Sequence, residues 1–298
     1  MEIITNRNKW FLISLGLIVI GLAVMLVNVA LGRGAFNYDV QFKGGTEFTI
    51  TFNEDPDVDN IRAIVTELTG QPNPQVVKIL GGNEVSIVIQ TVDQSVREEI
   101  IAKLVQTYSL PKANINYQDI SATISGEMQR SAVQAILAAC VIILAYVSFR
   151  FKNIVAGGSA IIALAHDVII VVLSYAVFRI PLNYSFIAAL LTILGYSINA
   201  TIIIFDRIRE NRSLLRRSTN EETINVSITQ TLKRCLYTSI TTLFTTVTLY
   251  IFGVTSIKEF MLPIIVGIVC GTYSSIFISG SVWYVLTVGP KKAFARAR

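Results

Sequence analysis

Long apolar runs constrain this chain more than any other feature of its sequence. Between Lys9 and Arg33 lie 23 uncharged residues, most of them leucine, isoleucine, valine or alanine. A helix needs roughly 20 such residues, at about 1.5 Å each, to cross the hydrocarbon of a membrane. Five more runs follow, interrupted only by His166 and Asp167, at 131–149, 153–178, 180–205, 235–257 and 260–290. The sequence therefore predicts an α-helical membrane protein with six transmembrane helices.

Basic residues set the expected orientation. Lysine and arginine gather in the short segments 1–9, 150–152, 206–234 and 291–298, which the positive-inside rule places in the cytoplasm. Both termini are then cytoplasmic, and the segment 32–129, with seven Lys/Arg against thirteen Asp/Glu, is exported. The net positive charge of the chain reflects this topology, so no nucleic-acid partner is expected. The first run is too long for the core of a signal peptide, and we expect an uncleaved anchor.

The exported segment is the size of a small domain. Alternating apolar residues predict strands at 42–52, 74–80, 83–91 and 114–124, with a hairpin turn at Gly81-Gly82, and helical spacing predicts helices at 57–68 and 93–108. The order β-α-β-β-α-β is typical of a ferredoxin-like α+β sandwich, a fold that many functions share. The expected division is a cytoplasmic N-terminus with the first helix at 1–34, an exported domain at 35–126, a five-helix bundle at 127–290 and a basic cytoplasmic tail at 291–298.

Catalytic chemistry has little support in the sequence. There is one histidine, no nucleophile motif and no cofactor fingerprint, and Gly44-Gly45 fits a turn or a close chain approach better than a phosphate cradle. Cys140, Cys235 and Cys270 lie in three different spans and offer neither a disulfide nor a metal-ligand spacing. We expect no enzyme, no cofactor and no metal. The candidate functional residues are polar groups inside the spans, which are costly in a bilayer.

The fifth span carries a polar stripe. Arg234, Thr238, Thr241, Thr245 and Thr248 recur at steps of four and three, which confines them to one helix face. The threonines either support a functional site or serve only in helix packing, with their hydroxyls hydrogen-bonded to the backbone of their own helix. Arg234 lies either inside the membrane or at its edge, where its side chain reaches water.

The fourth span has a polar face of its own. Thr192, Tyr196, Asn199 and Asp206 share this face, and Asp206 begins a charged turn expected in the cytoplasm. In the sixth span, Gly267 and Gly271 form a G-x-x-x-G motif followed by Ser274 and Ser275, a pattern that favours close packing of another helix.

His166 and Asp167 lie about midway along the third span. An aspartate at a helix centre costs about 2.5–3.5 kcal/mol to insert, so Asp167 is a candidate for proton transfer or for a structural hydrogen bond. Because adjacent helical residues point about 100° apart, the two side chains are not expected to face one site.

Ordered motifs along nearly the whole chain resemble one family. They read FKGGT after the first span, SFRFKNIVAG after the second, HD in the third, GYSIN and FDRIREN in the fourth, TLKR and YTSITTL in the fifth, and GTYSSIFIS in the sixth. This set resembles the SecF family, the smaller subunits of the SecD/SecF export complex, within the resistance-nodulation-division superfamily. The resemblance implies a bacterial inner-membrane subunit that pairs with SecD, associates with the protein-conducting SecYEG channel and uses the proton motive force to help exported polypeptides outward. It also implies a ferredoxin-like exported domain.

Two positions depart from the family pattern. Gln41 precedes Phe42 where the family usually has aspartate, which we expect to weaken a local turn or cap. Ala200 follows Ser197-Ile198-Asn199 where the family typically has aspartate, and the resemblance implies that this missing acid forms a proton relay with the arginine that corresponds to Arg234. The candidates for the proton relay are Arg234, Asp167, Asn199 and the position of Ala200. The polar face that would support the relay consists of Thr238, Thr241, Thr245, Tyr196 and Asp206. The helix-packing residues are Gly267, Gly271 and Ser274.

Two classes of function fit these residues. The chain is either a proton-driven motor subunit of protein export or a non-energised scaffold whose helices only hold a partner. A stand-alone small-molecule pump of the same superfamily is disfavoured, because such pumps carry twice as many spans. Since alanine binds no proton, we expect the chain to assemble with SecD but to conduct protons poorly, and Ala200→Asp, but not Ala200→Asn, to restore conduction. The competing hypothesis is that Asp167 carries the proton.

Overall fold

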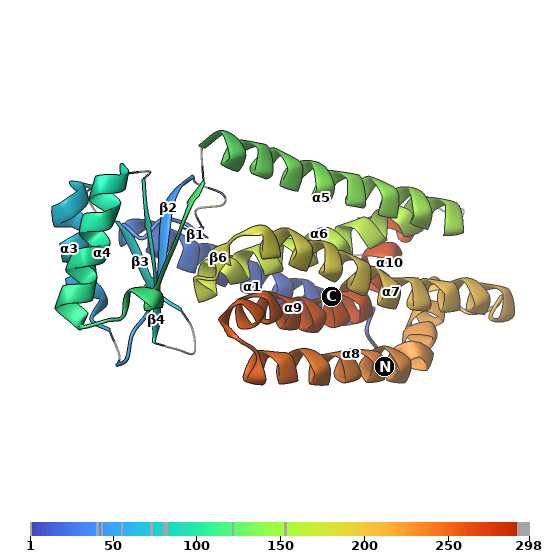
Figure 1. Ribbon diagram of the computed structural model, residues 1–298. Helices are drawn as coiled ribbons and strands as arrows, with labels where there is room; N and C mark the ends of the chain where they lie inside the picture. Colours follow the sequence, from blue (N-terminus) through green and yellow to red (C-terminus); the bar gives the residue numbers. More distant parts are fainter. Residues whose placement is uncertain are drawn as a thin grey trace.

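The computed structural model describes residues 2–290 except 40, 41, 43, 55, 72, 73, 80–82, 91, 121, 152 and 153, and excludes the side chains of 120, 122–125, 255 and 256. Gln41, the expected turn at Gly81-Gly82 and the basic tail 291–298 lie outside the described residues. The described chain forms a bundle of long helices with a small sheet domain, residues 45–120, at one end (Figure 1).

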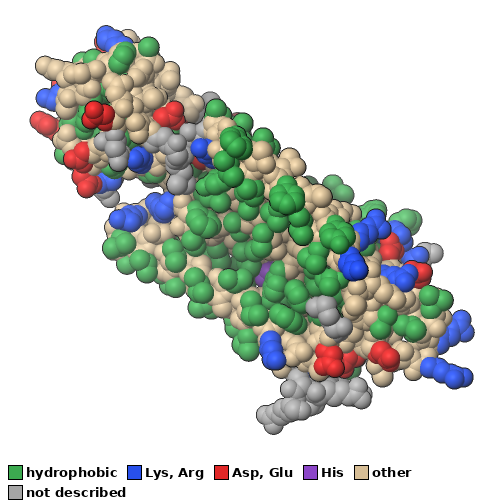
Figure 2. Space-filling view, turned by 90° about the horizontal axis from the view of Figure 1, so that it is seen from below, with side chains coloured by type: hydrophobic (Ala, Val, Ile, Leu, Met, Phe, Trp, Pro, Cys, Tyr) green, Lys and Arg blue, Asp and Glu red, His purple; other side chains and the backbone are tan. Residues whose placement is uncertain are grey.

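Six helices of the described chain are long and apolar enough to cross a membrane. Five are single helices: α1 (Arg7–Ala30), α5 (Ala122–Phe151), α6 (Ile154–Phe178), α7 (Tyr184–Leu214) and α8 (Asn220–Phe252). The sixth, Ile257–Val288, joins α9 (Thr255–Tyr273), the π-helical segment η2 (Ser274–Ser279) and α10 (Gly280–Val288). On the face shown in Figure 2, apolar side chains gather over the middle of the bundle and charged side chains lie toward its ends. The protein is therefore a multi-pass membrane protein, as the sequence predicts.

The charged segment after Phe205 differs from its prediction. The expected turn at Asp206 was wrong, because α7 has 31 residues and continues to Leu214. Arg207 Nη1 pairs with Glu210 Oε2 at 2.6 Å, a contact across one helical turn that suits continued helix. The next helix, α8, has 33 residues and starts at a cap in which Thr219 Oγ1 accepts the Glu222 N–H at 3.2 Å. The two helices are thus longer than the roughly 30 Å of hydrocarbon requires.

The sheet domain has one four-stranded antiparallel sheet with the strand order β3-β4-β2-β5. Two helices, α3 after β2 and α4 after β4, cover one face of this sheet and leave the other face toward the bundle (Figure 1). The elements follow one another as β-α-β-β-α-β: β2 (Gly45–Thr51), α3 (Val58–Thr69), β3 (Gln75–Lys78), β4 (Glu84–Ile89), α4 (Gln94–Tyr108) and β5 (Ile115–Ile120), with a short 3₁₀ turn η1 (Lys112–Asn114) before the last strand.

Local sequence explains where α3 begins and which face it buries. Asp57 Oδ1 accepts the N–H groups of Asp59 and Asn60 at 3.0 and 3.2 Å, which caps the helix start. The predicted apolar face packs into the core of the sheet domain, where its buried members are Ile61, Ile64 and Val65.

Two consecutive glycines, Gly44 and Gly45, lie at the start of β2. Gly44 and Gly45 have φ of +71° and +132°, and a Cβ on Gly45 would collide with the Ile89 carbonyl oxygen of the neighbouring strand. Only glycine fits such a position without strain, so the geometry agrees with a turn and a close chain approach.

A short segment ties the sheet domain to the bundle. We call residues Arg179–Asn183, between α6 and α7, the strap. Its strand β6 (Pro181–Leu182) pairs in parallel with β1 (Asn37–Tyr38), which precedes the sheet domain. Arg179 Nη1 and Nη2 donate to the carbonyl oxygens of Gly34 and Arg33 at 2.9 and 2.8 Å. The strap therefore joins the entry to the sheet domain with the ends of α6 and α7.

Candidate functional site

The candidate site centres on Asp167 of α6. Its side chain is fully buried, and it is the only carboxylate in the middle third of any of the six described spans. Along its length, α6 contacts α1, α5, α7, α9 and α10. The carboxylate is therefore enclosed by protein, as expected for an ionisable group that a membrane protein retains inside its spans.

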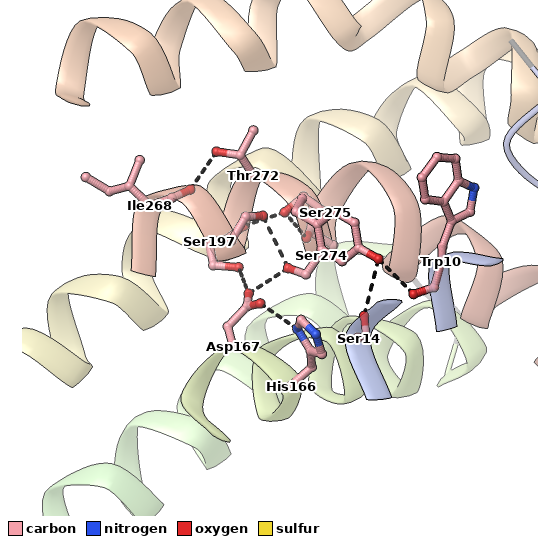
Figure 3. A network of polar contacts seen from close by, with 12 residues as sticks. Trp10, Ser14, His166, Asp167, Ser197, Ile268, Thr272, Ser274 and Ser275 are labelled. Atoms are coloured by element: carbon pink, nitrogen blue, oxygen red, sulfur yellow. Dashed lines mark hydrogen bonds and ion pairs between the residues drawn. The ribbon is translucent and has the colours of Figure 1, made fainter. Parts of the chain in front are cut away.

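Two serine hydroxyls bind the Asp167 carboxylate (Figure 3). Ser197 Oγ of α7 donates to Oδ2 at 2.5 Å, and Ser274 Oγ, at the start of η2, donates to the same oxygen at 2.7 Å. Hydrogen bonds to an ionised acceptor are short and roughly twice as strong as neutral ones. One side chain of α6 thereby joins α7 and the sixth span.

His166 also faces this site, so the expectation that it would point elsewhere was wrong. Its Nδ1 lies 2.9 Å from Asp167 Oδ1, because rotation about the side-chain bonds brings the ring back toward its neighbour. The imidazole is 8% exposed, and its buried Nε2 has no hydrogen-bond partner among the described residues. The donor and acceptor roles in this contact depend on the tautomer of the imidazole.

Four consecutive residues at the junction of α9 and η2 contact four different helices. Thr272 Oγ1 donates to Ser239 Oγ of α8 at 2.6 Å, and the Tyr273 hydroxyl donates to the Trp10 carbonyl oxygen of α1 at 2.7 Å. Ser274 reaches Asp167 of α6, as described above. The last contacts, to α7, are Ser275 Oγ with the Ser197 carbonyl oxygen at 3.2 Å and with Thr201 Oγ1 at 3.0 Å. We call residues 272–275 the junction; π-helical segments such as the one that starts here are frequent at functional sites.

The predicted polar stripe on α8 faces outward. Arg234 is exposed, and its guanidinium has no hydrogen bond or ion pair among the described residues. The threonines are exposed too, and each hydroxyl donates to a carbonyl of its own helix four residues earlier, at 2.7 to 3.4 Å, in Thr238, Thr241, Thr245 and Thr248. The structure does not bring the stripe to Asp167.

The predicted residues of α7 fall into different environments. Asn199 is exposed, whereas Ala200 is half-buried and packs against the main apolar cluster of the bundle. Tyr196 is half-buried, and its buried hydroxyl has no partner in the part of the chain that the structure describes. Asp206 pairs with Arg150 of α5 at 2.9 Å between half-exposed side chains. The face expected to act as a unit is thus divided.

The glycines of the sixth span lie against α7 of the same chain. A Cβ on Gly267 would come within 2.5 Å of Ile193 Cγ1, and one on Gly271 would come within 3.0 Å of Ser197 Cβ. The two glycines therefore permit the close approach of α9 to α7 that places Ser197 and Ser274 on one carboxylate.

Two of the site residues did not stand out in the sequence. Ser197 and Thr201 lie one turn apart and are buried on the face of α7 that meets the sixth span. Their four-residue spacing was the available signal, but Tyr196 and Asn199 drew attention to the neighbouring face.

The side chains around Asp167 offer hydrogen-bonding chemistry. No group of three or more His, Cys, Asp or Glu side chains in the described part of the chain could hold a metal ion. A carboxylate accepts hydrogen bonds, an imidazole can donate or accept, and the two serine hydroxyls donate to Asp167 Oδ2.

Comparisons with known proteins agree on one family. Residues 99–288 match the family described as protein export membrane protein SecD/SecF, C-terminal. The protein translocase subunit SecF of Alicyclobacillus acidocaldarius is 34% identical over 287 residues, which cover 94% of this chain and 91% of that protein. The protein translocase subunit SecDF of Thermus thermophilus is 36% identical over 270 residues, which cover 86% of this chain and 35% of that protein.

A solved structure shows the same fold. The crystal structure of SecDF from Thermus thermophilus, a translocon-associated membrane protein, matches with a TM-score of 0.85 at 34% identity and covers 98% of this chain and 39% of that chain. Proteins with these names are translocase subunits, which have a transport role. With a family match over more than half of its length and a SecF relative aligned over nearly all of it, the chain belongs to the SecD/SecF family of protein-export membrane proteins.

Proposed function

We propose that the chain is the SecF-type subunit of a bacterial protein-export complex. It pairs with SecD, adjoins the SecYEG channel and uses the proton motive force to promote passage of exported polypeptides across the inner membrane. The observation that carries this proposal is the alignment with the protein translocase subunit SecDF. The chain aligns with 35% of that protein, and we infer that a SecD-type partner corresponds to the remainder.

The proposed topology has cytoplasmic termini and an exported sheet domain. Support comes from the lysine and arginine residues of the short segments, including those near the end of α7 remote from the sheet domain. The strand order β3-β4-β2-β5, with both helices on one face, supports a ferredoxin-like domain within 35–126. The remaining proposed divisions are the N-terminus with the first helix, 1–34, the five-helix bundle, 127–290, and the tail, 291–298.

The outward stripe on α8 is the proposed contact with SecD. An exposed guanidinium and a row of hydroxyls are costly against lipid, and the cost falls when another protein covers them. Arg234 finds no partner among the described residues, so a polar or acidic group of the covering helices would suit it. Asn199, exposed on the adjacent helix α7, is assigned to the same surface.

Asp167 is the proposed proton acceptor of the chain as it stands, so we adopt the competing hypothesis in place of the expectation that the chain conducts protons poorly until Ala200→Asp restores the relay. At position 200, alanine has only a methyl group, which packs among apolar side chains. Asp167 has a carboxylate that can bind a proton, and its Oδ1 lies 2.9 Å from His166 Nδ1. A proton on the carboxylate removes the charge to which Ser197 and Ser274 donate and so weakens both bonds. Proton binding therefore loosens the contact of α6 with α7 and with the junction.

The strap extends this coupling to the exported domain. The two helices that hold Asp167 and Ser197 are the ones that the strap connects, and the strap pairs with β1. A shift of α6 against α7 would move the entry to the sheet domain with it. Two-state movement of packed helices is a usual route from a local charge change to a distant element.

A non-energised scaffold is the second candidate. Two observations favour it: both oxygens of Asp167 already have hydrogen-bond partners, and position 200 is alanine. A purely structural aspartate makes the same contacts. In that case the bonds would fasten the helices and no proton would cross.

Reconstituted vesicles separate the two candidates. Vesicles hold SecYEG, SecD and this chain, and the rate of export of an unfolded secretory polypeptide is measured with and without an imposed proton gradient. A motor subunit gives faster export with the gradient, and a protonophore removes the gain. A scaffold gives the same rate with and without the gradient, although vesicles that lack the chain export more slowly in either state.

A further inference from the structure

A cleft separates the sheet domain from the end of the bundle. Its volume is about 450 Å³, within the size range of ligand sites, and it lies between two packed units, where such sites are common. Its roof is the face of the sheet that α3 and α4 leave uncovered, and its floor is formed by the strap and by the adjoining ends of α6, α8 and α9.

The roof presents polar side chains at the spacing of an extended chain. Alternate residues of a strand point to one face and repeat at about 6.6–6.8 Å, the same repeat as the backbone groups of an extended peptide. Glu47 and Thr49 of β2 and Glu84 and Ser86 of β4 line the roof in this way. Glu47 accepts the Ser86 hydroxyl at 2.7 Å, whereas Thr49 and Glu84 bond no side chain among the described residues.

The floor is apolar next to charged groups. Phe178, Ile180, Pro181 and Leu262 supply an apolar surface at the membrane end of the cleft. Beside them, the side chains of Tyr250, Lys258 and Glu259 line the cleft without a hydrogen bond or ion pair in the described part of the chain. Polar side chains that bond no other side chain among the described residues therefore lie on both the roof and the floor, beside the apolar surface of the floor. This combination suits a ligand that has both amide groups and apolar side chains.

The charged residues of the lining indicate which charge the ligand carries. The lining holds the carboxylates of Asp39, Glu47, Glu84 and Glu259 against the cations of Lys78, Arg179 and Lys258. Asp39, Lys78 and Arg179 have interactions within the chain, and Glu47 accepts hydrogen bonds from Ser86 and Gln118. Among the described residues, the charged side chains of the lining that have no hydrogen bond or ion pair are therefore Glu84 and Glu259 against Lys258. An anionic lipid headgroup is disfavoured there, and a lysine or arginine side chain is favoured.

We propose that this cleft binds an extended segment of polypeptide and directs a basic side chain of that segment to Glu84 and Glu259. The proposal rests on the proposed role in export, since an unfolded chain emerging at this face of the membrane is the ligand of this chemistry. The backbone of the segment runs below the uncovered sheet face, and its apolar side chains lie on the strap and Leu262.

Peptide binding to the solubilised full chain tests the site. The probe is a fluorescein-labelled unstructured peptide of alternating valine, serine and lysine, and its counterpart has glutamate in place of lysine. We expect fluorescence anisotropy to show binding of the lysine peptide and much weaker binding of the glutamate peptide. The double variant Glu84→Gln with Glu259→Gln should bind the lysine peptide about tenfold more weakly, as expected when two partly exposed ion pairs are lost.

The matched control is Glu99→Gln. Glu99 is exposed on α4, on the covered side of the sheet, so this variant should bind like the unchanged chain. A photo-reactive benzoylphenylalanine in place of Thr49 should cross-link the lysine peptide, and one in place of Glu99 should not. Equal binding of the two peptides, unchanged binding by the double variant, or equal cross-linking from both positions would overturn the proposal.

Together with the export assay described above, the peptide-binding test distinguishes failure of the cleft proposal from failure of the proposed motor role. If gradient-driven export occurs but the lysine peptide does not bind, the cleft assignment fails and the motor role stands. If the peptide binds as expected but export does not respond to the gradient, the motor role fails and the cleft assignment stands.

Discussion

Replacing Gly267 by alanine perturbs the close contact between α9 and α7 that holds two serines against Asp167. The new Cβ would lie 2.5 Å from Cγ1 and 2.8 Å from Cγ2 of Ile193, whereas carbon atoms in good contact lie about 3.5–4.0 Å apart. Ile193 is 1% exposed and packs in an apolar cluster with Val171, Tyr175 and Leu190, so it has no free space to occupy. The helices therefore have to separate or Ile193 has to adopt a strained conformation.

Overpacking of this kind costs about 1–3 kcal/mol. Alanine also favours helix over glycine by about 1 kcal/mol, which acts in the opposite direction. Gly195 of α7 is the matched control, because a Cβ there meets nothing within 4 Å. Since both variants gain the same helix propensity, the difference between them isolates the overlap with Ile193.

Unfolding of the purified full chain in detergent by increasing dodecyl sulfate, followed by helical circular dichroism, measures this difference. We expect Gly195→Ala to be as stable as the unchanged chain or more so, and Gly267→Ala to be less stable than Gly195→Ala by about 1–3 kcal/mol. In an Ile193→Ala background the clash is gone, so the two glycine variants should there become equal. Equal stability of the two variants with Ile193 in place would refute the tight α7–α9 contact.

Three other predictions concern topology and the sheet domain. Single cysteines within 45–120 should react with an impermeant reagent outside the cell, and those within 207–230 only after permeabilisation; the reverse pattern would contradict the proposed orientation. Residues 36–123 expressed alone should be soluble and unfold cooperatively with a mixed α/β circular dichroism spectrum, and a disordered spectrum would count against an independent domain. Burial raises the pKa of Tyr108 above its ordinary value of 10.0, against a smaller lowering by the Asn60 hydrogen bond. The unfolded state then ionises first, so the stability of the domain should fall as pH rises above about 10, and Tyr108→Phe should remove that loss; a pH profile unchanged by Tyr108→Phe would contradict the assignment.

Periodic patterns made the large elements predictable. The apolar runs gave the spans because length and the absence of charge suffice to identify a membrane helix. In the sheet domain, Asp57 and the apolar face that follows gave both the start and the buried side of α3, because capping and helical spacing are local signals.

Pairings between helices could not be predicted from such signals. The contact of Ser197 with Asp167 joins residues on different helices, and a single sequence carries no record of which faces meet. A polar stripe shows that Arg234 and its threonines share a face, but not whether this chain or another protein covers that face. Asp206 belonged by its charges to a solvated turn, yet the ion pair with Arg150 and the continued helix keep it ordered.

Proton flux through vesicles that contain the chain with SecD tests the central claim, that Asp167 is the proton acceptor. The account predicts gradient-driven flux with alanine at position 200, loss of that flux in Asp167→Asn while the variant still co-purifies with SecD, and little change in Ala200→Asp relative to Ala200→Asn. No flux until Ala200→Asp supplies a carboxylate, or unchanged flux in Asp167→Asn, would contradict it and return the relay to the position where the family has aspartate.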